Sequence, residues 1–224
     1  MSFRRIRQSF RYGVGALVVN AALALAVLAG TRPAAADPLT ILALGDSLTA
    51  GYGLEQEDAF PVKLEAALRA RGHDVTVING GVSGDTSAGG LTRLDWALAA
   101  APGGMPDAMI LELGANDGLR GLDPEATEEN LNAIIRRARD EGVAVLLTGM
   151  LAPPNLGRDY GDEFRGLFPE LAEKHGVAFY PFFLDGVAAD PALNQEDGIH
   201  PNPKGVDIIV ERMLPHVERL IAGD

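Results

Sequence analysis

Short apolar runs alternate with longer amphipathic stretches from residue 39 onward. Five runs are apolar at nearly every position: residues 39–44, 75–78, 108–113, 143–148 and 177–180. This pattern is typical of strands in a parallel sheet, because helices cover both faces of the sheet and neither side of a strand meets water. The pattern therefore predicts five buried parallel strands.

The stretches between these runs repeat apolar side chains at helical spacing. They predict five helices, at about residues 59–71, 88–100, 124–141, 159–175 and 203–222. Pro124 suits a first helical turn, and Asp123 before it is a good N-cap. Glycine follows three of the predicted helices, at Gly72, Gly142 and Gly176, where a C-terminal cap favours it.

Strand and helix alternate about five times, which indicates βαβ units with right-handed connections. We predict an α/β fold of three αβα layers, in which a doubly wound, flavodoxin-like sheet has five parallel strands. No internal repeat or linker divides residues 37–224, so they are expected to form one domain. Ligands of such sheets bind beyond the carboxyl ends of the strands, and we therefore expect the chemistry in the loops that follow them.

Residues 1–36 depart from this pattern and predict a secretory signal peptide. Four arginines and no acid stand among the first eleven residues, and an apolar run then occupies residues 13–30. Small residues end the segment, so cleavage after Ala36 and a periplasmic or secreted protein are expected. The alternative is a retained membrane anchor, because the run is near the ~18 residues at which spanning becomes plausible.

Net charge and cysteine content limit the kinds of molecule that the protein is expected to bind. Without the predicted signal, the chain has 14 basic and 31 acidic residues, a net charge of −17. Such an acidic body repels polyanions, which argues against nucleic acid as a partner. No basic cluster would hold it on an anionic membrane after signal cleavage, and a monomer is the default expectation. Because the chain has no cysteine, it has neither disulfides nor thiolate metal ligands.

The loop after the first strand, residues 45–52, carries Ser47 just past a buried run. A serine at this point can be exposed at the carboxyl edge of the sheet. Position 49 is not glycine, so the loop is not the G-x-S-x-G elbow of α/β-hydrolases. A P-loop and a G-x-G-x-x-G motif are also absent from the sequence. Taken alone, Ser47 is as compatible with a helix N-cap as with a nucleophile.

The loops after the second and third strands offer backbone and amide donors. Residues 79–86 are rich in glycine, which permits close approach of a ligand or positive φ. The alternative is a tight turn capped by Asp85 or Thr86. In residues 114–118, Asn116 can present its amide as a donor, although Asn-Asp-Gly is also ordinary turn chemistry.

The last loop places Asp197 and His200 three residues apart, just before the final helix. A carboxylate at this spacing can bind one imidazole nitrogen and leave the other as a general base. A metal site is the alternative, but the chain has four histidines and no second one shares this spacing. We interpret His73, His175 and His216 as structural or surface residues and expect no metal.

Together these four loops resemble the signature blocks of the GDSL lipases, the SGNH hydrolase superfamily: residues 45–48 (GDSL), 83–87 (SGDTS), 114–117 (GAND) and 197–200 (DGIH). Order and spacing agree as well, over essentially all of residues 37–224. Residues 116–121 (NDGLRG) and 197–202 (DGIHPN) especially resemble the periplasmic bacterial thioesterase/lysophospholipase branch, whose members are often called arylesterases.

The resemblance implies an exported serine esterase with a catalytic triad. In this family pattern Ser47 attacks the carbonyl carbon, His200 takes its proton and Asp197 orients His200. The backbone N–H groups of Ser47 and Gly84 and the side chain of Asn116 would form the oxyanion hole. The branch acts on aryl esters, lysophospholipids and acyl thioesters, and it needs no metal or organic cofactor.

Substrate is less well defined by the sequence, although a small-molecule acyl ester or lipid is expected. Six apolar residues near the loop ends are candidates for an acyl groove, and each is also compatible with plain packing: Leu119, Leu122, Met150, Leu151, Leu156 and Phe164. A carbohydrate O-acetylesterase is the enzymatic alternative, but Trp96 is the only tryptophan that could serve as an aromatic sugar platform. A non-catalytic binding protein on the same fold is the other alternative, and it would normally lack one of the catalytic residues.

Overall fold

The computed structural model describes residues 38–223, so the predicted signal peptide lies outside the described residues. Five strands form one sheet: β1 (Leu39–Gly45), β2 (Val75–Gly81), β3 (Ala108–Glu112), β4 (Ala144–Thr148) and β5 (Ala178–Tyr180). All neighbouring strands are parallel, and their order is β2-β1-β3-β4-β5. This is the predicted doubly wound sheet, and each strand lies within three residues of its predicted bounds.

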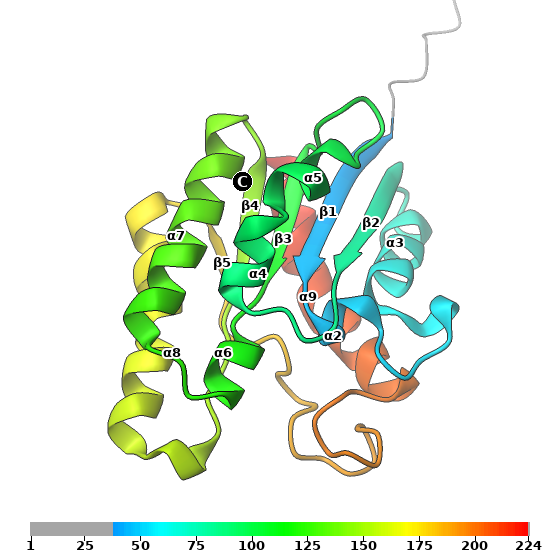
Figure 1. Cartoon of the computed structure of the whole chain (residues 1–224). Helices are drawn as coiled ribbons and strands as arrows, with labels where there is room; N and C mark the ends of the chain where they lie inside the picture. Colours follow the sequence, from blue (N-terminus) through cyan, green and yellow to red (C-terminus); the bar gives the residue numbers. More distant parts are fainter. Residues whose placement is uncertain (1–37, 224) are drawn as a thin grey trace, which may run out of the picture. The chain divides into compact units, whose positions relative to one another are not determined.

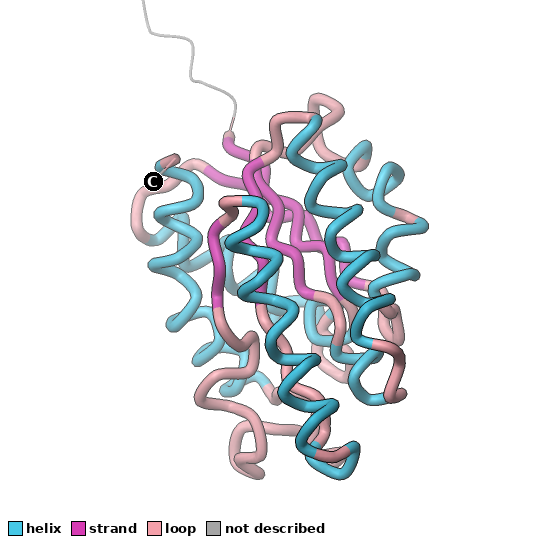
Figure 2. Tube along the Cα trace, turned by 90° about the vertical axis from the view of Figure 1, so that its left-hand side faces the viewer, coloured by secondary structure: helices cyan, strands magenta, loops and turns pink. Residues whose placement is uncertain are grey.

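Helices cover both faces of the sheet: α2 (Ser47–Ala50), α3 (Phe60–Ala70), α4 (Ser87–Thr92), α5 (Leu94–Ala99), α6 (Ala115–Leu119), α7 (Pro124–Asp140), α8 (Arg158–His175) and α9 (Pro203–Ala222). Helices α3 and α9 pack on one face, while α4, α5, α7 and α8 lie on the other (Figure 1). The view turned by 90° shows the strands between the two helical layers (Figure 2). Short 3₁₀ turns occupy Gln56–Asp58 and Pro154–Leu156.

The core explains the apolar runs in the sequence. Ile41, Leu42 and Leu44 of β1 are fully buried although their side chains alternate between the two faces. On the α7–α8 side, Phe164 and Phe168 pack edge to face, with ring centroids 5.6 Å apart. No helix among residues 38–223 is both long and apolar enough to cross a membrane.

Two features differ from the predicted elements. The helix predicted at residues 88–100 is two helices, α4 and α5, which meet at Arg93. Gly89 and Gly90 weaken helix formation in α4, and the backbone of Arg93 leaves the helical region with φ −103° and ψ 6°. The short helices α2 and α6 were not predicted, because four or five residues are too few to show a helical period.

The chain crosses from β2 back over β1 to β3, so the topological switch point lies beside the end of β1. Gly45 at that end is in register with Gly81 of β2 and with Glu112 of β3. Helices α2 and α6 lie at this edge of the sheet (Figure 1). The loops that carry the four sequence blocks are therefore attached to neighbouring strand ends or to α9.

Candidate active site

Ser47, His200 and Asp197 form one continuous hydrogen-bonded array. The Oγ atom of Ser47 lies 2.9 Å from His200 Nε2, and His200 Nδ1 lies 2.7 Å from Asp197 Oδ2. With the proton on Nδ1, the ring donates to Asp197 and accepts from the serine hydroxyl. The structure thus brings together two segments that are 153 residues apart in the sequence.

Helix α2 places Ser47, and it does so without using Ser47 as a cap. Asp46 is the N-cap, since its Oδ1 accepts the N–H of Leu48 at 2.9 Å. Ser47 is the first helical residue, where the helix offers no internal acceptor for its N–H. The capping interpretation of Ser47 is therefore wrong, and its hydroxyl is directed to His200.

The glycine before this turn is required by the strand beside it. A Cβ on Gly45 would collide with Thr49 Oγ1 and would lie 2.5 Å from Glu112 Oε2. These two groups are bonded to each other, with Thr49 Oγ1 donating to Glu112 Oε2 at 2.7 Å. Glu112 Oε2 also accepts the N–H of Asp46 at 3.3 Å. The turn that carries Ser47, residues 45–49 (the serine turn), is therefore held by hydrogen bonds to a buried carboxyl group of β3.

Burial dominates the electrostatics beneath the serine. It raises the pKa of Asp46 to about 6, although hydrogen bonds from Leu48 N–H and Asn116 oppose the shift. Burial, and then the nearby charge of Asp46, also raise the pKa of Glu112 well above its usual range. The protonated form of Glu112 is thus favoured, and its Oε1 has no hydrogen-bond partner among the described residues.

The turn that carries the imidazole favours an ionised Asp197. The backbone N–H groups of His200 and Ile199 donate to Asp197 Oδ1 at 3.0 Å each. These bonds, followed by the bond from the His200 side chain, lower the pKa of Asp197 to about 2. The carboxylate is therefore charged wherever His200 can act as a base.

Contacts with other loops hold the His200 ring in place. Gln195 N–H donates to the carbonyl of His200 at 2.7 Å, and Gln195 Nε2 donates to the carbonyl of Tyr52 at 2.7 Å. The ring of Tyr52 packs against that of His200, with centroids 4.6 Å apart. Sequence reasoning missed both residues, because neither belongs to a recognisable motif.

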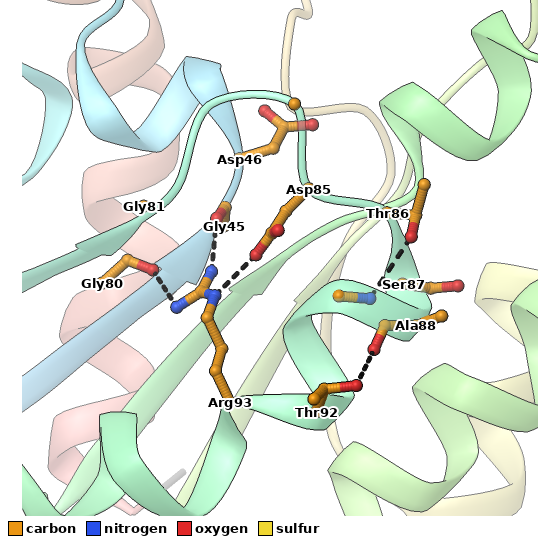
Figure 3. A network of polar contacts seen from close by, with 12 residues as sticks. Gly45, Asp46, Gly80, Gly81, Asp85, Thr86, Ser87, Ala88, Thr92 and Arg93 are labelled. Atoms are coloured by element: carbon orange, nitrogen blue, oxygen red, sulfur yellow. Dashed lines mark hydrogen bonds and ion pairs between the residues drawn. The ribbon is translucent and has the colours of Figure 1, made fainter.

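The glycine block supplies a backbone donor and a cap. Gly84 has φ +85°, in the left-handed region that favours glycine. Its N–H donates no hydrogen bond within residues 38–223, while its carbonyl accepts from Arg120 Nη2 at 2.9 Å. Thr86 caps α4 by accepting the N–H of Gly89. Asp85, the other candidate cap, instead forms an ion pair with Arg93 (Figure 3).

Asn116 joins the serine block to the glycine block. Its Nδ2 donates to Asp46 Oδ2 at 3.0 Å and to the backbone carbonyl of Asp85 at 2.9 Å. Gly114 with φ +111° precedes α6 and turns Asn116 toward these acceptors. Both amide hydrogens are therefore used within the protein, which the sequence pattern did not indicate.

An apolar cavity of about 440 Å³ opens beside Ser47 and His200. Three of the candidates for an acyl groove, Leu119, Met150 and Leu151, are among its lining residues. Leu122 and Leu156 lie outside its lining, and Phe164 is fully buried in the core. The groove prediction for these last three residues followed nearness in sequence, whereas the turn after α6 directs Leu122 elsewhere and α8 carries Phe164 into the core.

Part of the remaining apolar lining comes from a segment that the sequence did not mark. The segment after β5 contributes four residues: Phe182, Leu184, Ala188 and Ala189. This segment has neither a motif nor a helical period. The sequence did contain a signal for the buried carboxyl group under the serine turn, because Glu112 is the only charged residue in the apolar run 108–113.

The other three histidines lie in contacts away from this array. His73 contacts Glu218 at 3.2 Å, His175 contacts Asn132 at 2.8 Å, and the ring of His216 packs edge-on against Tyr180. Across the described part of the chain, no group of three or more His, Cys, Asp or Glu residues is arranged to hold a metal ion.

A parallel α/β sheet with a serine, a histidine and a carboxylate aligned at its carboxyl edge is the arrangement of a hydrolase. Residues 43–208 match the model of the GDSL-like Lipase/Acylhydrolase family, and the chain belongs to that family. It is therefore an ester-hydrolysing enzyme of the SGNH fold.

Similar proteins agree with this assignment. The chain is 44% identical over 181 residues to an arylesterase of Vibrio mimicus, covering 79% of this chain and 89% of that protein. It is 38% identical over 198 residues to Thioesterase 1/protease 1/lysophospholipase L1 of Escherichia coli K12, covering 88% and 91%. The crystal structure of TesA superposes with a TM-score of 0.76 at 39% identity, covering 81% of this chain and 99% of that one.

Proposed function

We propose that the protein is an exported serine esterase that hydrolyses acyl esters and thioesters through an acyl-enzyme on Ser47. The array from Ser47 Oγ to His200 Nε2 at 2.9 Å and on to Asp197 at 2.7 Å carries the proposal. Nucleophile, base and orienting carboxylate lie in the order that acyl transfer requires. The cavity beside them provides space for an acyl chain.

In the first half of the reaction, Ser47 Oγ attacks the carbonyl carbon and its proton passes to His200 Nε2. Asp197 stabilises the imidazolium that forms. His200 then gives the proton to the leaving oxygen or sulfur, and the acyl group stays on Ser47. In the second half, His200 takes a proton from water, the hydroxyl attacks the acyl carbon, and the carboxylic acid leaves while Ser47 regains its proton.

Three donors would hold the negative oxygen of each tetrahedral intermediate: Ser47 N–H, Gly84 N–H and Asn116 Nδ2. The two backbone groups have no acceptor within the described residues. The amide of Asn116 already donates to a carboxylate and to the carbonyl of Asp85. Hydrogen bonds to an ionised acceptor are roughly twice as strong as neutral ones, so the oxyanion competes well with that neutral carbonyl for the same hydrogen.

The cavity supports an acyl chain as the group that enters the site. Its lining is mainly apolar, and its polar side chains are those of Ser47 and His200 together with Asp46, Asn116 and Asn194. Arylesterase, thioesterase and lysophospholipase are the names of similar proteins. Export would separate the enzyme from cytosolic acyl-CoA, and we therefore propose aryl esters and lysophospholipids as substrates ahead of thioesters.

A fluorophosphonate probe and a substrate panel test this function. The wild-type enzyme should be labelled on Ser47 and should hydrolyse p-nitrophenyl acyl esters and lysophosphatidylcholine faster than acetylated xylan. The Ser47→Ala variant should show neither labelling nor turnover. Unlabelled wild-type enzyme, or a panel on which acetylated xylan is the best substrate, would contradict the proposal. Sequencing the N-terminus of protein from the exported fraction should find Asp37 first.

A further inference from the structure

The guanidinium group of Arg93 contacts the ends of two strands and the glycine block at once. Nε donates to Asp85 Oδ2 at 2.5 Å, Nη1 to the carbonyl of Gly80 at 2.8 Å, and Nη2 to the carbonyl of Gly45 at 2.9 Å (Figure 3). Each of its three nitrogens therefore has a different acceptor. Arg93 lies in none of the four sequence blocks and does not line the cavity.

Two of these three acceptor residues lie close in sequence to a proposed oxyanion donor. Gly45 precedes Ser47 by two residues at the end of β1, and Asp85 directly follows Gly84. The backbone carbonyl of Asp85 accepts from Asn116 Nδ2 at 2.9 Å. One side chain is thus linked through short, rigid connections to all three donors.

The guanidinium group of Arg93 is suited to holding its three acceptors at fixed distances from one another. The side chains of Arg93 and Asp85 are only 16% and 18% exposed, so their ion pair is little screened by water. A guanidinium is planar and donates in fixed directions, whereas a lysine ammonium is a compact charge that rotates freely. Gly45, Gly80 and Asp85 cannot move relative to one another without breaking one of the three bonds.

We propose that Arg93 is a positioning residue for the oxyanion hole, which it keeps in the geometry of the transition state by holding the serine turn and the glycine block at a fixed separation. This inference rests on the proposed esterase function and extends it to a residue outside the signature blocks. Arg93 touches no reacting atom. Its effect on the rate passes through the positions of Ser47 N–H, Gly84 N–H and Asn116.

Arg93→Lys is the test variant, and Arg69→Lys is its matched control. Arg69 also donates to a carbonyl of β2 (Val75 O, 2.9 Å) and pairs with a carboxylate (Glu65, 2.9 Å). Its contacts lie at the start of β2, at the opposite end of the strand from the site. Lysine keeps the charge beside Asp85 in the test variant, so the fold should be retained.

Four quantities separate positioning from stability: kcat and KM for a p-nitrophenyl ester, the melting temperature, and the Ki of an alkyl trifluoromethyl ketone. Ser47 Oγ adds to the ketone carbonyl while its proton passes to His200, which leaves an oxyanion in the hole. Because a displacement of about 1 Å in a catalytic group costs about 10²-fold, kcat of Arg93→Lys should fall by about that factor while KM changes by less than about threefold. The Ki should rise by the same factor as kcat falls. Arg69→Lys should leave kcat and Ki unchanged.

Unchanged kcat in Arg93→Lys, a fall in kcat without a rise in Ki, or an equal loss in Arg69→Lys would each overturn the inference. If Arg93→Lys does not fold, Asp85→Asn provides the same test, since it keeps the side-chain shape and weakens only the ion pair. It should lower kcat and raise Ki in parallel, and an unchanged Ki in a folded Asp85→Asn enzyme would also overturn the inference. Wild-type enzyme without turnover or probe labelling would instead reject the esterase function itself.

Discussion

Gly45→Ala places a methyl group between the serine turn and the buried carboxyl of β3. The new Cβ would collide with Thr49 Oγ1 and lie 2.5 Å from Glu112 Oε2, and both residues are buried. Forcing a methyl group into a packed interior costs about 1–3 kcal/mol. Displacing one partner of the buried Thr49–Glu112 hydrogen bond adds about 1–3 kcal/mol. We therefore expect a loss of about 2–6 kcal/mol in the free energy of unfolding.

Urea unfolding measures this loss directly, and calorimetry should show a melting temperature lower by about 2–4 °C for each kcal/mol. Gly161→Ala is the matched control. Gly161 lies in α8, and a Cβ there would meet no atom within 4 Å. The same substitution should stabilise that helix by about 0.5–1 kcal/mol. A Gly45→Ala protein as stable as the wild type would refute the assignment of Thr49 and Glu112 as the reason for this glycine.

Three further predictions concern the site. Ser47→Ala should abolish ester hydrolysis and leave the circular dichroism spectrum unchanged, and wild-type turnover in this variant would reject Ser47 as nucleophile. Asn116→Ala should lower kcat by about 10²–10³-fold with a smaller rise in KM; a pure KM effect would remove Asn116 from the oxyanion hole. The pKa of Asp46 is raised from 3.8 to about 6. Protonation of Asp46 therefore adds to the free energy of unfolding in full below pH 3.8, and this stabilisation is lost as the pH rises through about 6. Relative to Asp46→Asn, wild-type protein should thus lose about 3 kcal/mol between those pH values in urea unfolding, and parallel stability curves for the two proteins would contradict the raised pKa.

The strands were predictable because burial on both faces of the sheet leaves apolar runs in the sequence. Residues 79–81 of β2 were not included, since Asn-Gly-Gly has low strand propensity, and pairing with β1 extends the strand through them. The resemblance of the four loops to the GDSL signature blocks indicated Ser47 and His200 as partners, but only the fold shows that their side chains meet. Arg93 was missed for a physical reason: its role depends on acceptors 8, 13 and 48 residues away, which no local pattern reports.

The buried acid on β3 has a consequence for enzyme engineering. The five residues from Gly45 to Thr49 are contiguous and therefore look transferable to another protein. Two of their polar groups, however, are bonded to Glu112 on the neighbouring strand β3. Transplanting these five residues into a different scaffold would leave the hydroxyl of Thr49 and the amide of Asp46 without the acceptor that Glu112 provides. A successful graft must therefore carry a carboxyl, or its amide equivalent, on the neighbouring strand.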